Sequence, residues 1–302
     1  MALPLVHHPA FDARFDPAHR FPMGKFTRLA QILVEDGLVG PDGWHVPEPA
    51  EAELLSRAHD PAYVTQVLTQ SVPPAIEKAI GFPVDARVAM RSACACGGTL
   101  LAARLAMEHG IACNTAGGSH HAGRSGGAGF SVFNDVAVAA ATLLHERSVG
   151  RILVFDCDVH QGDGTARIFE DEPDVVTVSI HAEKNYPEKK ARSDFDVPLP
   201  DGTGDDAYLR VLEETLERTA WLGAFDIVFY NAGVDPHRDD RLGRLSLTDA
   251  GLMARDRRVI GFYRDLGLPV ACVIGGGYSR DIEAVSRRHT IVHRAAAEFF
   301  RS

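Results

Sequence analysis

The stretch that decides the fold is Asp156-Cys157-Asp158-Val159-His160-Gln161-Gly162-Asp163-Gly164, which directly follows the apolar run Ile152-Leu153-Val154-Phe155. An apolar run of this length is typical of a buried strand in a parallel sheet. Because side chains alternate across a strand, Asp156, Asp158 and His160 should leave its end on one side. Oxygen and nitrogen ligands at this spacing suit a divalent metal, and the histidine favours zinc. The alternative is a strand that ends in a solvated acidic turn.

The rest of the chain alternates strands with helices. Strands are expected at residues 111–114, 152–155, 175–180, 225–230 and 269–274. Helices are expected at residues 25–35, 84–109, 136–146, 165–169 and 205–222, after Thr248, after the cap Asp60-Pro61, and at the end of the chain. This alternation implies right-handed crossovers and a mainly parallel α/β sheet with helices on both faces. No repeat or linker interrupts it, so residues 1–302 are expected to form a single domain.

Composition is that of an ordinary soluble globular protein, with 45% hydrophobic and 24% charged residues. No apolar run reaches the roughly 18 residues of a membrane span. The start of the chain lacks the layout of a signal peptide, so a cytoplasmic protein is expected. The net charge of −10 argues against non-specific binding to nucleic acid and is compatible with a cationic substrate or partner.

The five cysteines do not predict a disulfide framework, because their number is odd and no secretory signal precedes them. Cys94 and Cys96 lie in an alanine-rich helical pattern and should pack inside the protein. Cys157 alternates away from the flanking carboxylates, so we expect it to pack under the sheet.

Four of the expected strands end in loops rich in polar or glycine residues. These loops contain His120-His121, the run from Asp156 to Asp163, Asp235, and Gly275-Gly276-Gly277-Tyr278. In a parallel sheet all four strand ends lie at one edge, where α/β enzymes place their sites. Each feature is weak alone, but their joint placement predicts a metal-dependent active site.

The residue types in these loops suit metal-assisted amide hydrolysis. Two carboxylates and one imidazole can hold Zn²⁺ and leave positions open for water and a substrate carbonyl. A nearby histidine can take a proton from that water and pass it to the leaving amine. Spare carboxylates can orient the histidines, and a tyrosine hydroxyl can hydrogen-bond a developing oxyanion.

These motifs resemble the zinc-dependent histone deacetylases. The resemblance rests on Gly118-Ser119-His120-His121-Ala122, Gly129-Phe130, the run 156–164, Asn231-Ala232-Gly233-Val234-Asp235 and Gly275-Gly276-Gly277-Tyr278, all in the family's order. Other stretches are most similar to the class IV branch, namely Gly81-Phe82-Pro83, Gly97-Gly98-Thr99, Tyr186-Pro187 and Asp240-Arg241-Leu242-Gly243-Arg244-Leu245-Ser246.

The resemblance implies a three-layer arginase/deacetylase fold with a mainly parallel eight-stranded sheet. It implies that the zinc ligands are Asp158, His160 and Asp235. It implies that His121 is the general base and acid and that Asp163 supports it. It implies that His120, paired with Asp156, acts through electrostatics and hydrogen bonding. Tyr278 would donate a hydrogen bond to the carbonyl oxygen. The implied activity is removal of acetyl or longer acyl groups from lysine side chains or related amines.

The resemblance also implies substrate and potassium sites. Gly129 and Phe130 would form one wall of an acyl tunnel, with Tyr186 near the other wall, Leu242 near the rim, and Gly276 lining the tunnel or a channel beneath it. A structural K⁺ would be held by Asp156, Asp158, His160, Ser179 and Ile180. Ser119, the loop 124–127 and Gln161 depart from common members of the family. They bear on the substrate rather than on the chemistry, so protein acyl-lysine and acylated small amines both remain open.

Two other functions are compatible with parts of the pattern. A two-manganese ureohydrolase of the arginase type needs further carboxylates, but here Gly162 follows at the second position after His160, and Pro236-His237 follow Asp235. An inert, metal-stabilised binding protein would normally close its site with four ligands, whereas three are offered here. The presence of His121, Asp163 and Tyr278 also favours catalysis.

Overall fold

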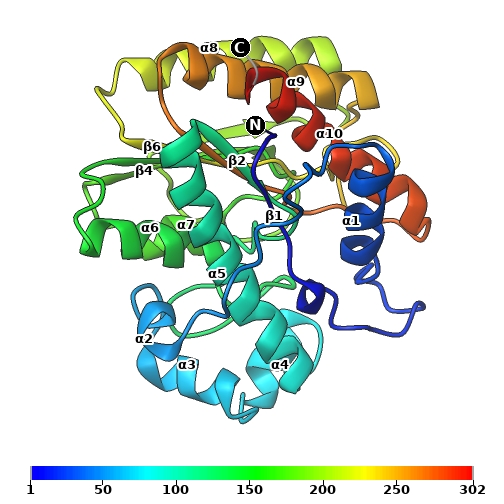
Figure 1. The fold of residues 1–302 in the computed structure, drawn as a ribbon, viewed down its shortest axis with the longest axis vertical. Helices are drawn as coiled ribbons and strands as arrows, with labels where there is room; N and C mark the ends of the chain where they lie inside the picture. Colours follow the sequence, from blue (N-terminus) through cyan, green and yellow to red (C-terminus); the bar gives the residue numbers. More distant parts are fainter. Residues whose placement is uncertain (1, 301–302) are drawn as a thin grey trace.

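The computed structural model describes residues 2–300 and has three layers, with a sheet between two sets of helices (Figure 1). The strands are β1 (Leu5–Val6), β2 (Ile111–Asn114), β3 (Ile152–Asp156), β4 (Val175–Ala182), β5 (Phe195–Leu199), β6 (Ile227–Asn231) and β7 (Val270–Val273). Every pairing between them is parallel, in the order β1-β2-β7-β6-β3-β4-β5.

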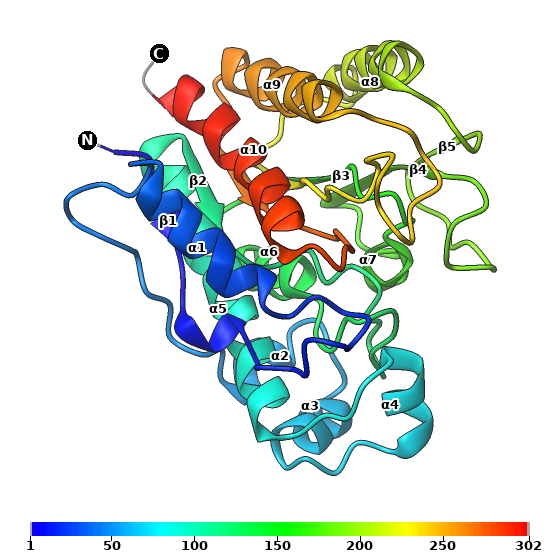
Figure 2. The same cartoon turned by 90° about the vertical axis from the view of Figure 1, so that its right-hand side faces the viewer.

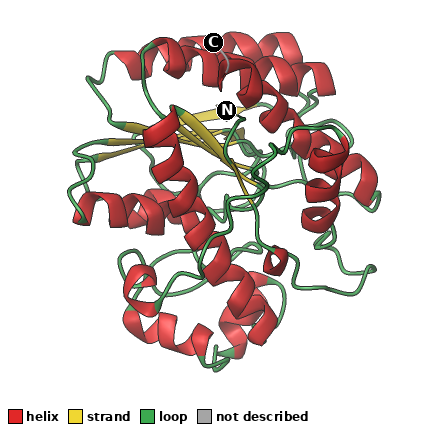
Figure 3. Ribbon diagram, in the orientation of Figure 1, coloured by secondary structure: helices red, strands yellow, loops and turns green. Residues whose placement is uncertain are grey.

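The helices cover both faces of this sheet. They are η1 (Pro9–Phe11), α1 (Lys25–Glu35), α2 (Ala52–Leu55), α3 (Pro61–Leu68), α4 (Pro74–Ile80), α5 (Ala86–His109), α6 (Asp135–His145), α7 (Asp163–Ile168), α8 (Asp205–Ala220), α9 (Asp249–Asp265) and α10 (Ile282–Phe300). Helices α8, α9 and α10 lie on one face, and α5, α6 and α7 on the other (Figure 2). Helix α1 packs against α10. Helices α2 to α4 extend the layer of α5, α6 and α7 away from the sheet (Figure 3).

The central strands are buried along their whole length, which explains their continuous apolar sequences. Every residue of β2, β3, β6 and β7 is buried. Side chains of the types that favour this position cap two of the expected helices, because Asn134 accepts from Ala137 N and Thr248 accepts from Gly251 N. Asp60 occupies the cap position before Pro61 as expected, but its side chain makes no capping hydrogen bond.

The described residues form a seven-stranded sheet, one strand fewer than the eight that the family resemblance implied. At the β1 edge, His45 makes a single parallel bridge with Val6. Pro47 and Pro49 follow it and have no N–H to donate, so the ladder does not extend. No strand was expected at residues 195–199, but β5 forms there and makes the opposite edge of the sheet.

The order of the strands fixes where a site can form. From β2 through β3 to β4 the chain advances across the sheet by way of α6 and α7, and from β5 through β6 to β7 it returns by way of α8 and α9. Right-handed crossovers in opposite directions place the helices on opposite faces. The neighbouring strands β3 and β6 therefore send their next segments in opposite directions. A crevice at their carboxyl ends is the usual ligand site of such a sheet.

All five cysteines are buried and unpaired, as expected. Cys94 and Cys96 lie inside α5, and Cys157 is fully buried beside the end of β3. Within residues 2–300, no helix combines the length and the apolar character needed to cross a bilayer.

Candidate active site

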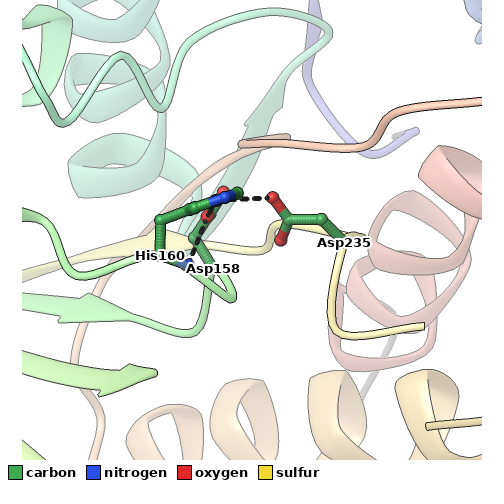
Figure 4. Close-up of side chains that lie close together, drawn as sticks. All are labelled: Asp158, His160 and Asp235. Atoms are coloured by element: carbon green, nitrogen blue, oxygen red, sulfur yellow. Dashed lines mark hydrogen bonds and ion pairs between the residues drawn. The ribbon is translucent and has the colours of Figure 1, made fainter. Parts of the chain in front are cut away.

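Asp158, His160 and Asp235 lie close together just beyond the carboxyl ends of β3 and β6 (Figure 4). All three are buried, and one ligand atom from each lies within 4.8 Å of the others. The Nδ1 atom of His160 is 3.0 Å from Oδ1 of Asp158 and 3.2 Å from Oδ2 of Asp235. The structure thus brings together the three residues that the family resemblance implied as metal ligands.

The environment of this triad fits a cation. Asp235 Oδ2 is buried and accepts no hydrogen bond of normal geometry, although His160 Nδ1 lies 3.2 Å away. Burial and the negative charge of Asp158 raise the pKa of Asp235 to about 7, which is the response of two carboxylates that face one another without a full countercharge. A Cβ atom at Gly276 would meet both Asp235 Oδ2 and Asp158 Oδ2, so the glycine keeps the space between the carboxylates open. Two carboxylates and one imidazole are a ligand set that zinc accepts.

Two histidine–carboxylate pairs lie beside the triad. His120 Nδ1 is 2.6 Å from Asp156 Oδ2, and His121 Nδ1 is 2.6 Å from Asp163 Oδ1. Burial opposes protonation of both rings, but Asp156 and Asp158 raise the pKa of His120 to about 9. Burial and the charge of His120 lower the pKa of His121 to about 4. At neutral pH one imidazole is therefore charged, and the other is neutral and able to accept a proton.

Tyr278 lies on the loop after β7, with its ring edge-on to that of His160 at a centroid distance of 6.1 Å. Phe21 and Phe130 also contact the Tyr278 ring. Burial and the negative charge of Asp158 raise the pKa of Tyr278 well above its usual value, so the hydroxyl keeps its proton and remains a donor.

A cavity of about 350 Å³ leads from the surface to these groups. Its lining includes His121, His160 and Tyr278 together with four of the five residues expected to contact substrate, namely Gly129, Phe130, Tyr186 and Leu242. The Tyr186 ring stands edge-on to His121 at 4.8 Å. The fifth expected residue, Gly276, lines a smaller cavity beneath, of about 30 Å³.

Phe130 has a backbone φ of +66°, which a residue with a side chain rarely adopts. Hydrogen bonds from Gly129 N to Ala79 O and from Phe130 N to Ile80 O hold this turn against the end of α4. The strained turn therefore has a rigid support, as strained residues at functional sites usually do.

A larger cavity lies elsewhere in the described chain. It measures about 910 Å³ and lies among α6, α7 and the loop after α6. We assign the site to the smaller cavity of about 350 Å³ because, unlike the larger one, it is lined by His121, His160 and Tyr278.

The residues expected to hold potassium lie on adjacent segments. Asp156 pairs with Ser179 in the register of β3 and β4, and Ile180 follows in β4. Ser179 Oγ lies 3.0 Å from His181 Nδ1.

Three positioning residues were not identified from the sequence. The Asp240 carboxylate accepts hydrogen bonds from the backbone N–H groups of Tyr278, Leu242 and Gly243 at 2.6, 2.8 and 3.0 Å. It thereby ties the tyrosine loop to the rim of the tunnel. Lys25, which is buried at the start of α1, donates to Gly277 O at 3.2 Å.

Arg255 on α9 is fully buried beneath the loops that carry Asp158 and Asp235. It donates to Gly233 O at 2.6 Å and to Cys157 O at 3.2 Å. These carbonyl groups belong to the loops that carry Asp235 and Asp158, so one guanidinium group holds both loops. Nothing in the local sequence around Asp240, Lys25 or Arg255 marks these roles, although Asp240 lies within a stretch that carries the family resemblance.

Comparison with known proteins agrees with this geometry. The chain matches the family described as histone deacetylase domain over residues 19–295. An uncharacterized protein of Picosynechococcus sp. is 46% identical over 99% of this chain and 100% of its own length. Histone deacetylase 2 of Arabidopsis thaliana is 30% identical over 96% of this chain and 80% of its own length. A probable deacetylase of Archaeoglobus fulgidus is 30% identical over 91% of this chain and 80% of its own length.

The crystal structure of the HDA15 HD domain matches with a TM-score of 0.83 and 22% identity, covering 99% of this chain and 89% of that chain. That likeness identifies the fold as the three-layer α/β arginase/deacetylase fold. Because the family match spans most of the sequence and two named deacetylases align over most of it, the chain belongs to the histone deacetylase family.

Proposed function

We propose that this chain is a zinc-dependent deacylase that hydrolyses the amide of an acyl-lysine side chain. The observation that carries the proposal is the meeting of three features at one sheet edge. These are a buried carboxylate–imidazole triad, a histidine pair with opposite protonation tendencies, and a tyrosine hydroxyl at the inner end of a tunnel. The proposal takes residues 1–302 as one catalytic domain of the class IV type.

Asp158, His160 and Asp235 would hold the zinc ion. When bound there, zinc supplies Lewis-acid polarisation of the substrate carbonyl and lowers the pKa of a water molecule. The remaining steps belong to the protein. His121, neutral at pH 7, accepts the proton of the attacking water and later delivers it to the lysine amine. Asp163 accepts the hydrogen bond from His121 Nδ1 and so leaves Nε2 free for that transfer.

The other polar groups act on charge and position. His120 is protonated and paired with Asp156, and its positive charge stabilises the developing oxyanion. The Tyr278 hydroxyl donates a hydrogen bond to the same oxygen. Because this donor is already in position, it lowers the barrier without a rearrangement of the site during the reaction. Gly129 and Phe130 on one side, and Tyr186 on the other, enclose the acyl-lysine chain, with Leu242 at the rim. A structural potassium ion at Asp156, Asp158, His160, Ser179 and Ile180 is part of the same proposal.

The two-manganese alternative receives no support from the neighbours of the triad. Gly162 has no side chain to offer a second metal. His237 lies 3.3 Å from Asp249 at the start of α9, so its ring is engaged outside the triad.

The test compares metal-loaded parent protein with His121→Ala, using an acetyl-lysine peptide and measuring zinc content in parallel. Hydrolysis should nearly disappear in the variant while zinc remains bound, because His121 is not in the ligand triad. His145→Ala, at the exposed end of α6, is the matched control. Activity of His121→Ala close to that of the parent would reject the assignment of the base. Zinc-loaded parent protein that hydrolyses none of the acyl-lysine peptides would reject the proposed function.

A further inference from the structure

The mouth of the tunnel carries a charge opposite to that of the whole chain. Three cationic side chains line it, and they are Arg20, Lys184 and Arg244. Among the described residues, no aspartate or glutamate lines this cavity. The whole chain has 41 acidic residues against 31 basic ones. A net charge of −10 is compatible with a cationic substrate, but the charged side chains that line the entrance are positive.

Contacts within the tunnel loops hold the Arg20 side chain and the backbone of the segments that carry Lys184 and Arg244. The Arg20 guanidinium lies over the Phe130 ring at 4.7 Å from its centroid. Asn185, which is buried, donates to Leu242 O at 2.7 Å and accepts from Arg244 N at 3.0 Å. One amide therefore joins the loop that carries Lys184 to the loop that carries Arg244. The cations belong to built walls of the tunnel, one beside Phe130 and the others beside Tyr186 and Leu242.

Two of the three charges are not neutralised by the protein. Arg244 forms an ion pair with Asp201 at 3.1 Å. In the described part of the chain, Arg20 and Lys184 have no ion-pair partner. Both are therefore free to attract an anionic group that approaches the entrance, and both repel a cationic one.

We propose that this site acts on acyl-lysine flanked by acidic residues, and that cationic tails and acetylated polyamines are poor substrates; this rests on the proposed deacylase function. When an acyl-lysine side chain enters the tunnel, the peptide segments on either side lie against the mouth. Aspartate or glutamate there meets Arg20 and Lys184, whereas lysine or arginine meets like charge. Complementary charge of this kind acts on encounter rate and on selection between partners.

The test uses three acetyl-lysine peptides of equal length, flanked by aspartate, by glutamine or by arginine, with the zinc-loaded protein at low ionic strength. We expect kcat/KM for the acidic peptide to exceed that for the basic peptide about tenfold, since two exposed charges contribute a few-fold each. The difference should shrink as salt is added. Arg20→Glu and Lys184→Glu should each reduce the ratio of acidic to basic kcat/KM, and the double variant should invert it.

Arg210→Glu is the matched control, because it makes the same charge change at an exposed position on α8. Equal kcat/KM for the three peptides, or a ratio that Arg20→Glu and Lys184→Glu leave unchanged, would overturn the proposal. Hydrolysis of the glutamine-flanked peptide without any charge preference would overturn this inference alone and leave the deacylase function standing.

Binding of the same peptides, followed by fluorescence anisotropy, gives a readout that does not depend on turnover. Tighter binding of the acidic peptide, lost in Lys184→Glu, would support the charge selection even in a protein that hydrolysed nothing. Equal binding of the three peptides together with no hydrolysis would overturn both proposals.

Discussion

The Asp240→Asn substitution should slow hydrolysis by breaking the hydrogen bond that holds the backbone of Tyr278. Asp240 is not one of the triad residues and does not line the tunnel. One oxygen of the Asp240 carboxylate accepts from Leu242 N and Gly243 N, and the other accepts from Tyr278 N at 2.6 Å. Asparagine retains the first acceptor and places an NH₂ group opposite the Tyr278 N–H. The rim therefore keeps its support, while the tyrosine loop loses its hydrogen bond and faces a second donor.

The expected size follows from that single bond. A hydrogen bond to a charged acceptor contributes about 1.5–3 kcal/mol. If the loss appears in the transition state, kcat falls by roughly 10- to 100-fold, at about 1.4 kcal/mol per factor of ten. KM should change little, because Leu242 and Gly243 stay in place. The upper limit is the effect of Tyr278→Phe itself, which should lower kcat by about 10²–10³ while zinc content is unchanged.

A double-mutant cycle is the deciding assay. Steady-state kcat and KM are measured for the parent, Asp240→Asn, Tyr278→Phe and the double variant, each with matched zinc content and a thermal unfolding curve. If Asp240 acts through Tyr278, the double variant is no slower than Tyr278→Phe alone. Two independent, additive losses would refute the reasoning, as would an Asp240→Asn variant that raises KM without lowering kcat.

Three further changes test other parts of the structure. Burial lowers the pKa of His59 to about 4, so below pH 6.5 the unfolded chain takes up a proton that the folded chain does not. Between pH 7 and pH 5 the parent should therefore lose about 2 kcal/mol more of its free energy of unfolding than His59→Gln does, as measured by urea denaturation. A parallel pH dependence in both proteins would contradict this. Arg255→Lys cannot hold two carbonyl groups as the guanidinium does, so zinc affinity in a chelator competition should weaken by about 10-fold or more; unchanged affinity would remove Arg255 from the support of the triad. Added zinc should raise the unfolding temperature of the metal-stripped parent but not that of Asp235→Asn; an equal rise in both would show that zinc binds elsewhere.

The sequence predicted the central strands, and the placement of polar residues at one edge of the sheet, because both depend on local patterns. The apolar runs of β3, β6 and β7 mark buried parallel strands, and the polar residues directly after them must meet once the strands are parallel. Strand β5 escaped prediction for a physical reason. It is an edge strand whose burial alternates, and it contains Pro198, so it carries neither a continuous apolar run nor a proline-free segment.

The positioning residues could not be predicted because their roles arise only from tertiary contact. Lys25 and Gly277 are far apart in the chain, as are Arg255 and Cys157, and each pair meets through a backbone carbonyl group. Every residue has a backbone carbonyl group, so the sequence does not show which of them will accept such a hydrogen bond. The positive charge of the tunnel mouth likewise arises only from tertiary structure. Arg20, Lys184 and Arg244 come from three separate loops, and the net charge of the whole chain has the opposite sign.

The position of β6 and β7 has a consequence for how the protein is made. They occupy the middle of the sheet, between β2 and β3, although both come later in the chain than either neighbour. A growing chain that ends before Ile227 can pair β1 with β2 and β3 with β4 and β5, but these two half-sheets keep open inner edges. Only insertion of the later strands unites the histidine pair, Asp158 and Asp235. Completion of the sheet and assembly of the Asp158–His160–Asp235 triad are therefore one event, and removing the C-terminal quarter would take out the centre of the sheet rather than its edge.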